Sequence, residues 1–220
     1  MRGMFDTVKQ AIADIRSGAM VIVTDDEDRE NEGDLALAAE FVTAEKMAFI
    51  IRHTGGVVCL SLSDALADQI DLPPMVAKNT SKRGTPFTVS IEAAEGIATG
   101  ISAEDRAKTI LAAIKDDAKP EDLSRPGHVF PLRAQEGGVL WRAGHTEASV
   151  DLCKLAGLKP AAVISELMHD DGTMMRGPAL ESFARVHTLT VVSIAELIAY
   201  RYAHESFIRL EAETILQTSF

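Results

Sequence analysis

The sequence has few cysteines, few aromatic residues and no long apolar run. It holds 2 cysteines in 220 residues, too few for the disulfide framework of a small secreted domain. Cys59 and Cys153 lie in apolar and helical stretches, so we expect both as buried free thiols. No apolar run approaches the roughly 18 to 20 residues that cross a bilayer, and residues 1–18 lack a signal-peptide core. We therefore expect a cytoplasmic protein that does not enter a membrane.

Basic residues are also scarce relative to acidic ones. The chain has 22 Lys and Arg against 33 Asp and Glu, which gives a net charge of −11. The stretch DDEDRENEGD at 25–34 contains seven acids and a single base, Arg29, and carries more than half of that imbalance. The acidity is therefore local. Because no broad basic face is available to phosphates, we expect no nucleic-acid partner.

Strand-like and helix-like patterns alternate along the chain. Short apolar runs rich in β-branched residues predict strands, and periodic stretches with caps predict helices. We predict an α/β (α+β) fold, a single domain over 1–205 with a mixed sheet and helices packed around it, and a helical extension at 206–220. The predicted strands are 19–26, 34–42, 57–63, 85–93, 161–167 and 190–193. The predicted helices are 1–18, 43–56, 64–70, 102–116, 145–160, 182–189 and 193–205, and 119–138 is predicted to be a structured loop.

The acidic stretch 25–34 has two readings. Most charge runs are solvated surface, but this one follows an apolar strand, precedes another and contains Asn31 and Gly33. An EF-hand calcium loop is excluded, because Gly33 at position 6 puts Ala39 where position 12 needs Glu. The alternative is a hard-cation site that uses one or two carboxylates. The other acids are then free for proton transfer, hydroxyl contacts or pairing with Arg29.

A second group of residues has the parts of an anion site. In WRAGHTEASVDL, Arg142 precedes the short Ala143–Gly144 turn and a helix start near Thr146. Helix amino termini and arginine forks both bind phosphate, and His145 can bind a metal or carry a proton. A capped helix after an arginine is also common without any function. Two further candidates are His128, after a Pro-Gly turn, and Glu166, at the end of an apolar strand. Together these parts predict a magnesium-dependent enzyme that acts on a sugar phosphate.

Six motifs extend the prediction. DDEDRENEGD, RHTGGVVCLSLS, TVSIEAAEGIATGISAEDRAKTI, RPGHVFPLRA, GGVLWRAGHTEASVDLCKLAGLKPAAVISEL and DDGTMMR occur in this order. The chain, from about Phe5 to about His204, resembles the 3,4-dihydroxy-2-butanone 4-phosphate synthase family of riboflavin biosynthesis. The resemblance implies that D-ribulose 5-phosphate is converted to L-3,4-dihydroxy-2-butanone 4-phosphate and formate. It also implies Mg²⁺ or Mn²⁺, no organic cofactor, and enolisation followed by skeletal rearrangement and loss of C4.

The resemblance assigns roles to residues of this sequence. It implies that Glu30 and His145 bind the metal and that His128 and Glu166 are catalytic. The substrate contacts that it implies are Arg29, Glu30, Asp34, Arg142, Ala143, Gly144, His145, Thr146 and Glu166. Less firmly, it suggests Glu32 and Asp26 as acid–base or supporting groups, and Thr99 as a phosphate contact.

The resemblance also implies a homodimer with its sites near the interface, where His128 and Thr99 would serve the neighbouring subunit. Ala143 stands where the family usually has a second glycine, which is tolerable if φ there is negative. Trp141 is expected to pack over the site or the interface. The chain ends too early for the GTP cyclohydrolase II domain of bifunctional relatives, so we expect one activity. The rival functions are another magnesium-dependent pentose-phosphate isomerase and a cation-binding module without catalysis.

Overall fold

The computed structural model describes residues 5–205, which form one mixed sheet flanked by helices, as the sequence predicts. The predicted extension at 206–220 lies outside the described residues. The strands are β1 (Val21–Thr24), β2 (Gly33–Ala38), β3 (Cys59–Leu62), β4 (Ile91–Ala93), β5 (Leu123–Arg133), β6 (Ala161–Glu166) and β7 (Thr190–Ser193). The α-helices are α1 (Asp6–Arg16), α2 (Ala44–His53), α3 (Asp64–Gln69), α4 (Ala103–Ala113), α5 (His145–Leu155), α6 (Gly177–His187) and α7 (Ile194–His204). Short 3₁₀ turns are η1 (Ala39–Phe41), η2 (Pro120–Asp122) and η3 (Gly138–Leu140).

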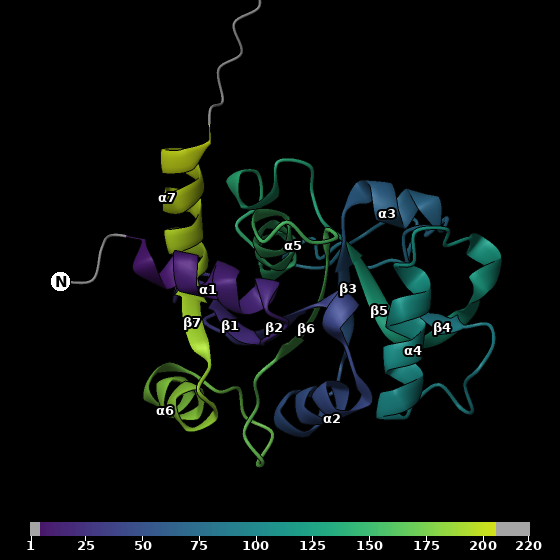
Figure 1. Cartoon of the computed structure of the whole chain (residues 1–220), viewed down its shortest axis with the longest axis horizontal. Helices are drawn as coiled ribbons and strands as arrows, with labels where there is room; N and C mark the ends of the chain where they lie inside the picture. The colour runs from purple at the N-terminus through teal and green to yellow at the C-terminus, as the bar shows by residue number, and fades with distance from the viewer. Residues whose placement is uncertain (1–4, 206–220) are drawn as a thin grey trace, which may run out of the picture.

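The strand order is β4-β5-β3-β6-β2-β1-β7, which Figure 1 shows from right to left. Two neighbouring pairs, β1–β7 and β3–β5, are parallel, and the other four are antiparallel. The register pairs Thr24 with Gly33, Asp34 with Glu166, and Ile164 with Cys59. The end of β1, the start of β2, the end of β6 and the start of β3 therefore lie at one edge of the sheet.

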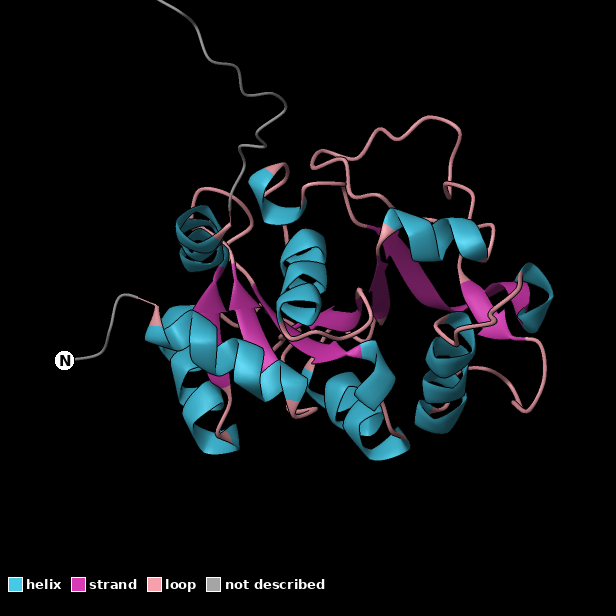
Figure 2. Ribbon diagram, turned by 45° about the horizontal axis from the view of Figure 1, so that its top comes forward, coloured by secondary structure: helices cyan, strands magenta, loops and turns pink. Residues whose placement is uncertain are grey.

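Apolar side chains fill both faces of the sheet. Along β2, Leu35 and Leu37 face one core while Ala36 and Ala38 face the other, as the two-residue period of a strand requires. The first core packs α2, α4 and α6 against the sheet, and the second packs α1, α5 and α7 against the opposite face. Figure 2 shows helices on both sides of the sheet. The two-sided burial explains why the strands read as nearly continuous apolar runs.

In three helices, the polar side chain that the sequence predicts as a cap does cap the first turn. The side chains of Thr43, Ser63 and Ser102 accept hydrogen bonds from the backbone N–H three residues later, which satisfies groups that the first helical turn leaves free. At α5, where the sequence predicts a helix start near Thr146, the helix begins at His145; Gly144 is the capping residue, and no side chain caps the helix. Among residues 5–205, no helix combines the length and the apolar character needed to cross a membrane.

The largest error of the sequence prediction concerns 119–138. Its prolines and glycines predict a loop, yet Leu123–Arg133 forms the long strand β5, parallel to β3 and antiparallel to β4. The prolines are tolerated because sheet contacts use their carbonyls: Pro131 O accepts from Thr88 N at 3.0 Å. Smaller differences are that β2 ends at Ala38, before a 3₁₀ turn, that β4 covers only Ile91–Ala93 of the predicted strand 85–93, and that α6 begins at Gly177.

Gly127 allows β4 and β5 to approach closely. A Cβ atom added to Gly127 would lie 2.1 Å from the carbonyl carbon and oxygen of Ile91 and 2.5 Å from the nitrogen of Glu92. We therefore expect Gly127→Ala to lower the free energy of unfolding by about 1–3 kcal/mol, measured by urea denaturation. The matched control is Gly55→Ala, whose Cβ would meet only the flexible end of Met168 at 3.1 Å. Equal stability of the two variants would contradict the close approach.

Candidate active site

A cavity of about 170 Å³ opens at the sheet edge where β1, β2, β3 and β6 meet the start of α5. It is large enough for a small ligand with bound water. Eight of the residues singled out from the sequence line it: Arg29, Glu30, Glu32, Asp34, Arg142, His145, Thr146 and Glu166. The fold thus brings the acidic stretch together with the RAGHT segment (142–146) and Glu166, which lie more than a hundred residues further along the sequence.

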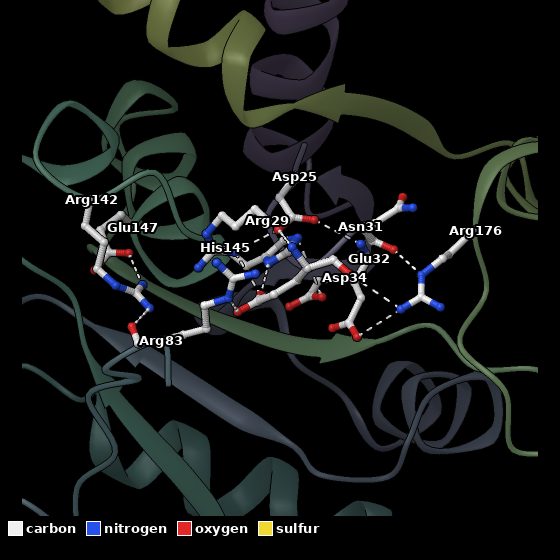
Figure 3. A network of polar contacts seen from close by, with 11 residues as sticks. Asp25, Arg29, Asn31, Glu32, Asp34, Arg83, Arg142, His145, Glu147 and Arg176 are labelled. Atoms are coloured by element: carbon white, nitrogen blue, oxygen red, sulfur yellow. Dashed lines mark hydrogen bonds and ion pairs between the residues drawn. The ribbon is translucent and has the colours of Figure 1, made fainter. Parts of the chain in front are cut away.

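Asp25 shapes the acidic loop between β1 and β2. Its Oδ2 accepts hydrogen bonds from the backbone N–H of Glu30 and from Arg29 Nη1, both at 2.9 Å, and its Oδ1 accepts from the N–H of Glu32 at 2.9 Å. The Asp25 side chain is only 1% exposed. These bonds direct the side chains of Arg29, Glu30 and Glu32 to the cavity (Figure 3).

Not every acid of the loop takes part. Asp26, Glu27 and Asp28 are exposed, and none of them lines the cavity. The loop is therefore a solvated charge run on one side and a cavity wall on the other. Asp26, which the resemblance suggests as a supporting group, points to the solvated side in this arrangement, while Glu32 lies on the cavity side.

Three side chains could hold a divalent cation. Asp25, Glu30 and His145 each offer one ligand atom, and these atoms lie within 4.8 Å of one another. Glu30 Oε2 is 3.6 Å from His145 Nδ1, and Asp34 Oδ1 is 3.9 Å from His145 Nε2. Both Asp34 Oδ1 and His145 Nε2 are buried without a hydrogen-bond partner among the described residues. Carboxylate oxygens, and an imidazole nitrogen once it has lost its proton, are donors that fit a hard cation such as Mg²⁺ or Mn²⁺.

The cavity shifts the pKa values of its carboxylates in opposite directions. Contact with His145, together with Arg29, outweighs burial and lowers the pKa of Glu30 to about 2. Burial raises the pKa of Asp34 to about 7, and the negative charge of Glu166 adds to the rise. Burial also raises the pKa of Glu32. For His145, burial lowers the pKa, but Asp34 and Glu30 outweigh burial and raise it to about 9.

The RAGHT segment forms the other wall of the cavity. Gly144 precedes α5, and His145 and Thr146 begin it, both buried. Ala143 does not lie among the residues with positive φ, so the methyl in place of the usual glycine causes no backbone strain there. Arg142 Nη1 donates to Glu147 Oε2 at 2.6 Å. Trp141 is 76% exposed, so it does not pack over the site of its own chain.

Ala143 and Gly144 do not line the cavity themselves, and His128 and Thr99 lie away from it. His128 is in β5, half-exposed, and its Nδ1 contacts Glu92 of β4. Thr99 is exposed in the loop before α4, where Asp105 accepts hydrogen bonds from the neighbouring N–H groups of Ala98 and Gly100. Neither His128 nor Thr99 lines the cavity of its own chain. Glu166 does, opposite Asp34 in the β2–β6 register.

Sequence reasoning missed several residues of the site. Arg176 donates from Nε to Asn31 O at 2.5 Å and lies 3.7 Å from Glu32, so it anchors the acidic loop to the start of α6. Arg83 Nε is 4.0 Å from Glu30 Oε1. Glu147 contacts Arg142 from inside the first turn of α5. No sequence signal distinguishes these from surface ions. The remaining lining residues are Cys59, Thr85, Phe87, Leu132 and Ile164.

Comparison with known proteins identifies the family. The sequence model of 3,4-dihydroxy-2-butanone 4-phosphate synthase matches residues 9–200. The chain belongs to the 3,4-dihydroxy-2-butanone 4-phosphate synthase family. A synthase of this name from Escherichia coli (strain SMS-3-5 / SECEC) is 59% identical over 201 residues, which cover 91% of this chain and 93% of the Escherichia coli protein. One from Cronobacter sakazakii is 60% identical over the same shares of the two chains.

A solved structure extends the likeness to three dimensions. A crystal structure of 3,4-dihydroxy-2-butanone 4-phosphate synthase in complex with two magnesium ions superposes with a TM-score of 0.88 at 44% identity. The match covers 91% of this chain and 98% of the other. The fold of this chain is thus the synthase fold. Its homologues carry the name of this synthase, which is a lyase.

Glu30 and His145 allow a direct test of cation binding. We expect Glu30→Ala and His145→Ala each to weaken Mg²⁺ binding by more than about 10-fold, because each removes one of the clustered donor atoms. Isothermal titration calorimetry with Mg²⁺ measures the affinity. Glu27→Ala is the control, because it removes an exposed acid from the same loop. Wild-type affinity in either test variant would refute the site.

Proposed function

We propose that this chain converts D-ribulose 5-phosphate to L-3,4-dihydroxy-2-butanone 4-phosphate and formate, a step of riboflavin biosynthesis. The observation that carries the proposal is the match to the synthase family over residues 9–200. Curated relatives of that name, which share 59–60% identity over nine-tenths of the chain, support it. The cavity, with its carboxylates and the RAGHT segment at one sheet edge, supplies the groups that the reaction needs.

The proposed metal is Mg²⁺, with Mn²⁺ as a substitute, and Glu30 and His145 are its proposed ligands. The two magnesium ions in the solved relative support this choice, as do the clustered donor atoms of this chain. When bound, the cation stabilises negative charge that develops on substrate oxygens. No organic cofactor is part of the proposal, so side chains, the cation and water must supply all of the chemistry.

The proposed substrate contacts divide by charge. Arg142, Thr146 and the amino-terminal end of α5, with Ala143 and Gly144 before it, take the phosphate group. Arg29 and Asp34 contact the sugar hydroxyls. Asp34 has a pKa of about 7, so its carboxyl can both accept and deliver a proton near neutral pH.

Glu166 and His128 are the proposed catalytic residues. Glu166 lines the cavity next to Asp34, within reach of a substrate held there. His128 lies outside the cavity of its own chain, so we propose a homodimer in which His128, and Thr99 as a phosphate contact, serve the partner subunit. We also propose a cytoplasmic location and assign residues 1–205 to one synthase domain.

Formate release separates the proposal from its rivals. With Mg²⁺ we expect one formate released per D-ribulose 5-phosphate consumed. Adding a chelator should stop formate release, and returning Mg²⁺ should restore it. An enzymatic formate assay measures the product. A pentose-phosphate isomerase would change the sugar without formate, and a cation-binding module would bind Mg²⁺ without turnover. Either result would reject the proposed reaction.

The shared site can be tested by mixing two inactive variants. In His128→Ala and Glu166→Gln homodimers, each proposed site lacks one catalytic residue. After unfolding and refolding together, half of the dimers are mixed. If His128 serves the partner's site, each mixed dimer contains one intact site, so we expect about a quarter of the wild-type activity. Sites contained within single chains would give no recovery, because every chain still carries a defect.

A further inference from the structure

We propose that Glu147 is a positioning residue that orients the guanidinium of Arg142 for the phosphate group of the substrate. The inference rests on the proposed function, because it concerns how the same cavity recognises its anion. Glu147 lies in the first turn of α5, one residue after Thr146, and does not line the cavity itself. It would therefore act through Arg142 and not by touching the substrate.

The contacts of Glu147 tie Arg142 to the helix. Its side chain is 0% exposed, its Oε2 accepts from Arg142 Nη1 at 2.6 Å, and its Oε1 accepts from Gln135 N at 3.1 Å. A carboxylate buried without partners would be strongly unfavourable. Both oxygens of Glu147 accept hydrogen bonds, so two residues of the segment between β5 and α5 hold the acid in place. Figure 3 shows the contact with Arg142.

Gly144 leaves the space for this ion pair. A Cβ atom at Gly144 would lie 2.3 Å from Arg142 Nη1 and 2.9 Å from Glu147 Oε2. The φ of Gly144 is −125°, a value open to any residue. The glycine is thus required by the position of the Arg142–Glu147 pair and not by the turn. A site in which the helix start, the glycine and the ion pair fit together restricts the Arg142 side chain to one arrangement.

That arrangement suits an anion in the cavity. A guanidinium has five N–H donors in one plane, so the bond from Nη1 to a fixed carboxylate restricts the positions that the other donors can take. The Arg142 side chain is 20% exposed and lines the cavity. Among residues 5–205, its other donors contact only Arg83 O, at a long 3.5 Å. Donors of Arg142 are therefore left for phosphate oxygens.

Asp151 provides a control that distinguishes a positioning role of Glu147 from a purely structural one. Asp151, one turn further along α5, is also a buried acid, accepts from Val139 N at 2.8 Å and pairs with Arg201 at 2.7 Å. It holds the same segment through η3 but has no contact with Arg142 among the described residues. Asp151→Asn thus disturbs the support of the segment without disturbing the Arg142 orientation.

The experiment compares steady-state formate release by wild type, Glu147→Gln, Asp151→Asn, Arg142→Ala and the Arg142→Ala/Glu147→Gln double variant. We expect Glu147→Gln to raise KM for D-ribulose 5-phosphate about 10-fold, the effect of one lost charge-assisted contact, with kcat within about 2-fold. The amide oxygen of Gln can still accept from Gln135, which preserves the fold. Asp151→Asn is expected to lower Tm and leave KM near the wild-type value. The double variant is expected to have the same KM as Arg142→Ala, because Glu147 acts on KM only through Arg142.

Three results would overturn the proposal: an unchanged KM in Glu147→Gln, an equal rise of KM in Asp151→Asn, or additive effects on KM in the double variant. Circular dichroism on each variant establishes that the compared proteins are folded. If the wild type releases no formate, the proposed reaction fails instead. Calorimetric titration with inorganic phosphate then tests Glu147 independently: weaker phosphate binding in Glu147→Gln than in Asp151→Asn supports the positioning role, and equal binding rejects it.

Discussion

The concentration of carboxylates at one edge of the sheet is the constraint on which the site depends. The loop that carries them keeps its shape because both oxygens of Asp25 accept hydrogen bonds, from two backbone N–H groups and from Arg29. Arg29 and His145 then balance Glu30. Asp34, by contrast, faces Glu166 across the β2–β6 pair. Carboxylate oxygens from the loop and from two strands therefore surround His145 at this edge, and they are the kind of donors that a hard cation prefers.

The same charge distribution separates two chemical roles. The pKa of Glu30 falls to about 2 and that of Asp34 rises to about 7, although both acids line one cavity. A carboxylate with a low pKa stays ionised and is suited to hold a metal, while one that titrates near neutral pH is suited to proton transfer. The difference in pKa comes from position. Glu30 lies on the half-exposed loop beside Arg29, whereas Asp34 is buried as the second residue of β2.

The sequence predicts the members of the site better than their support. Residue types in shaped loops identify Arg142 and His145 as candidates. Among the seven acids of 25–34, only the family resemblance selects Glu30 and Asp34. Asp25 looks like its exposed neighbours, since only the fold decides which acids of a run turn inward. Likewise β5 reads as a loop, because partner strands from distant parts of the chain outweigh its local proline and glycine content.

The two walls of the cavity share one electrostatic design. Glu30 on the acidic wall carries Arg29 as a counter-ion, and Arg142 on the opposite wall carries Glu147. Each ligand-binding group is therefore held in place and nearly neutralised within its own wall. A ligand gains most when it satisfies the unused donors and acceptors of both walls at once. A sugar phosphate with a bound divalent cation does so, because its phosphate matches the arginine wall and its cation matches the acidic one. Under the proposed function, free phosphate or free cation would engage one wall only, and the cavity would select for the combination.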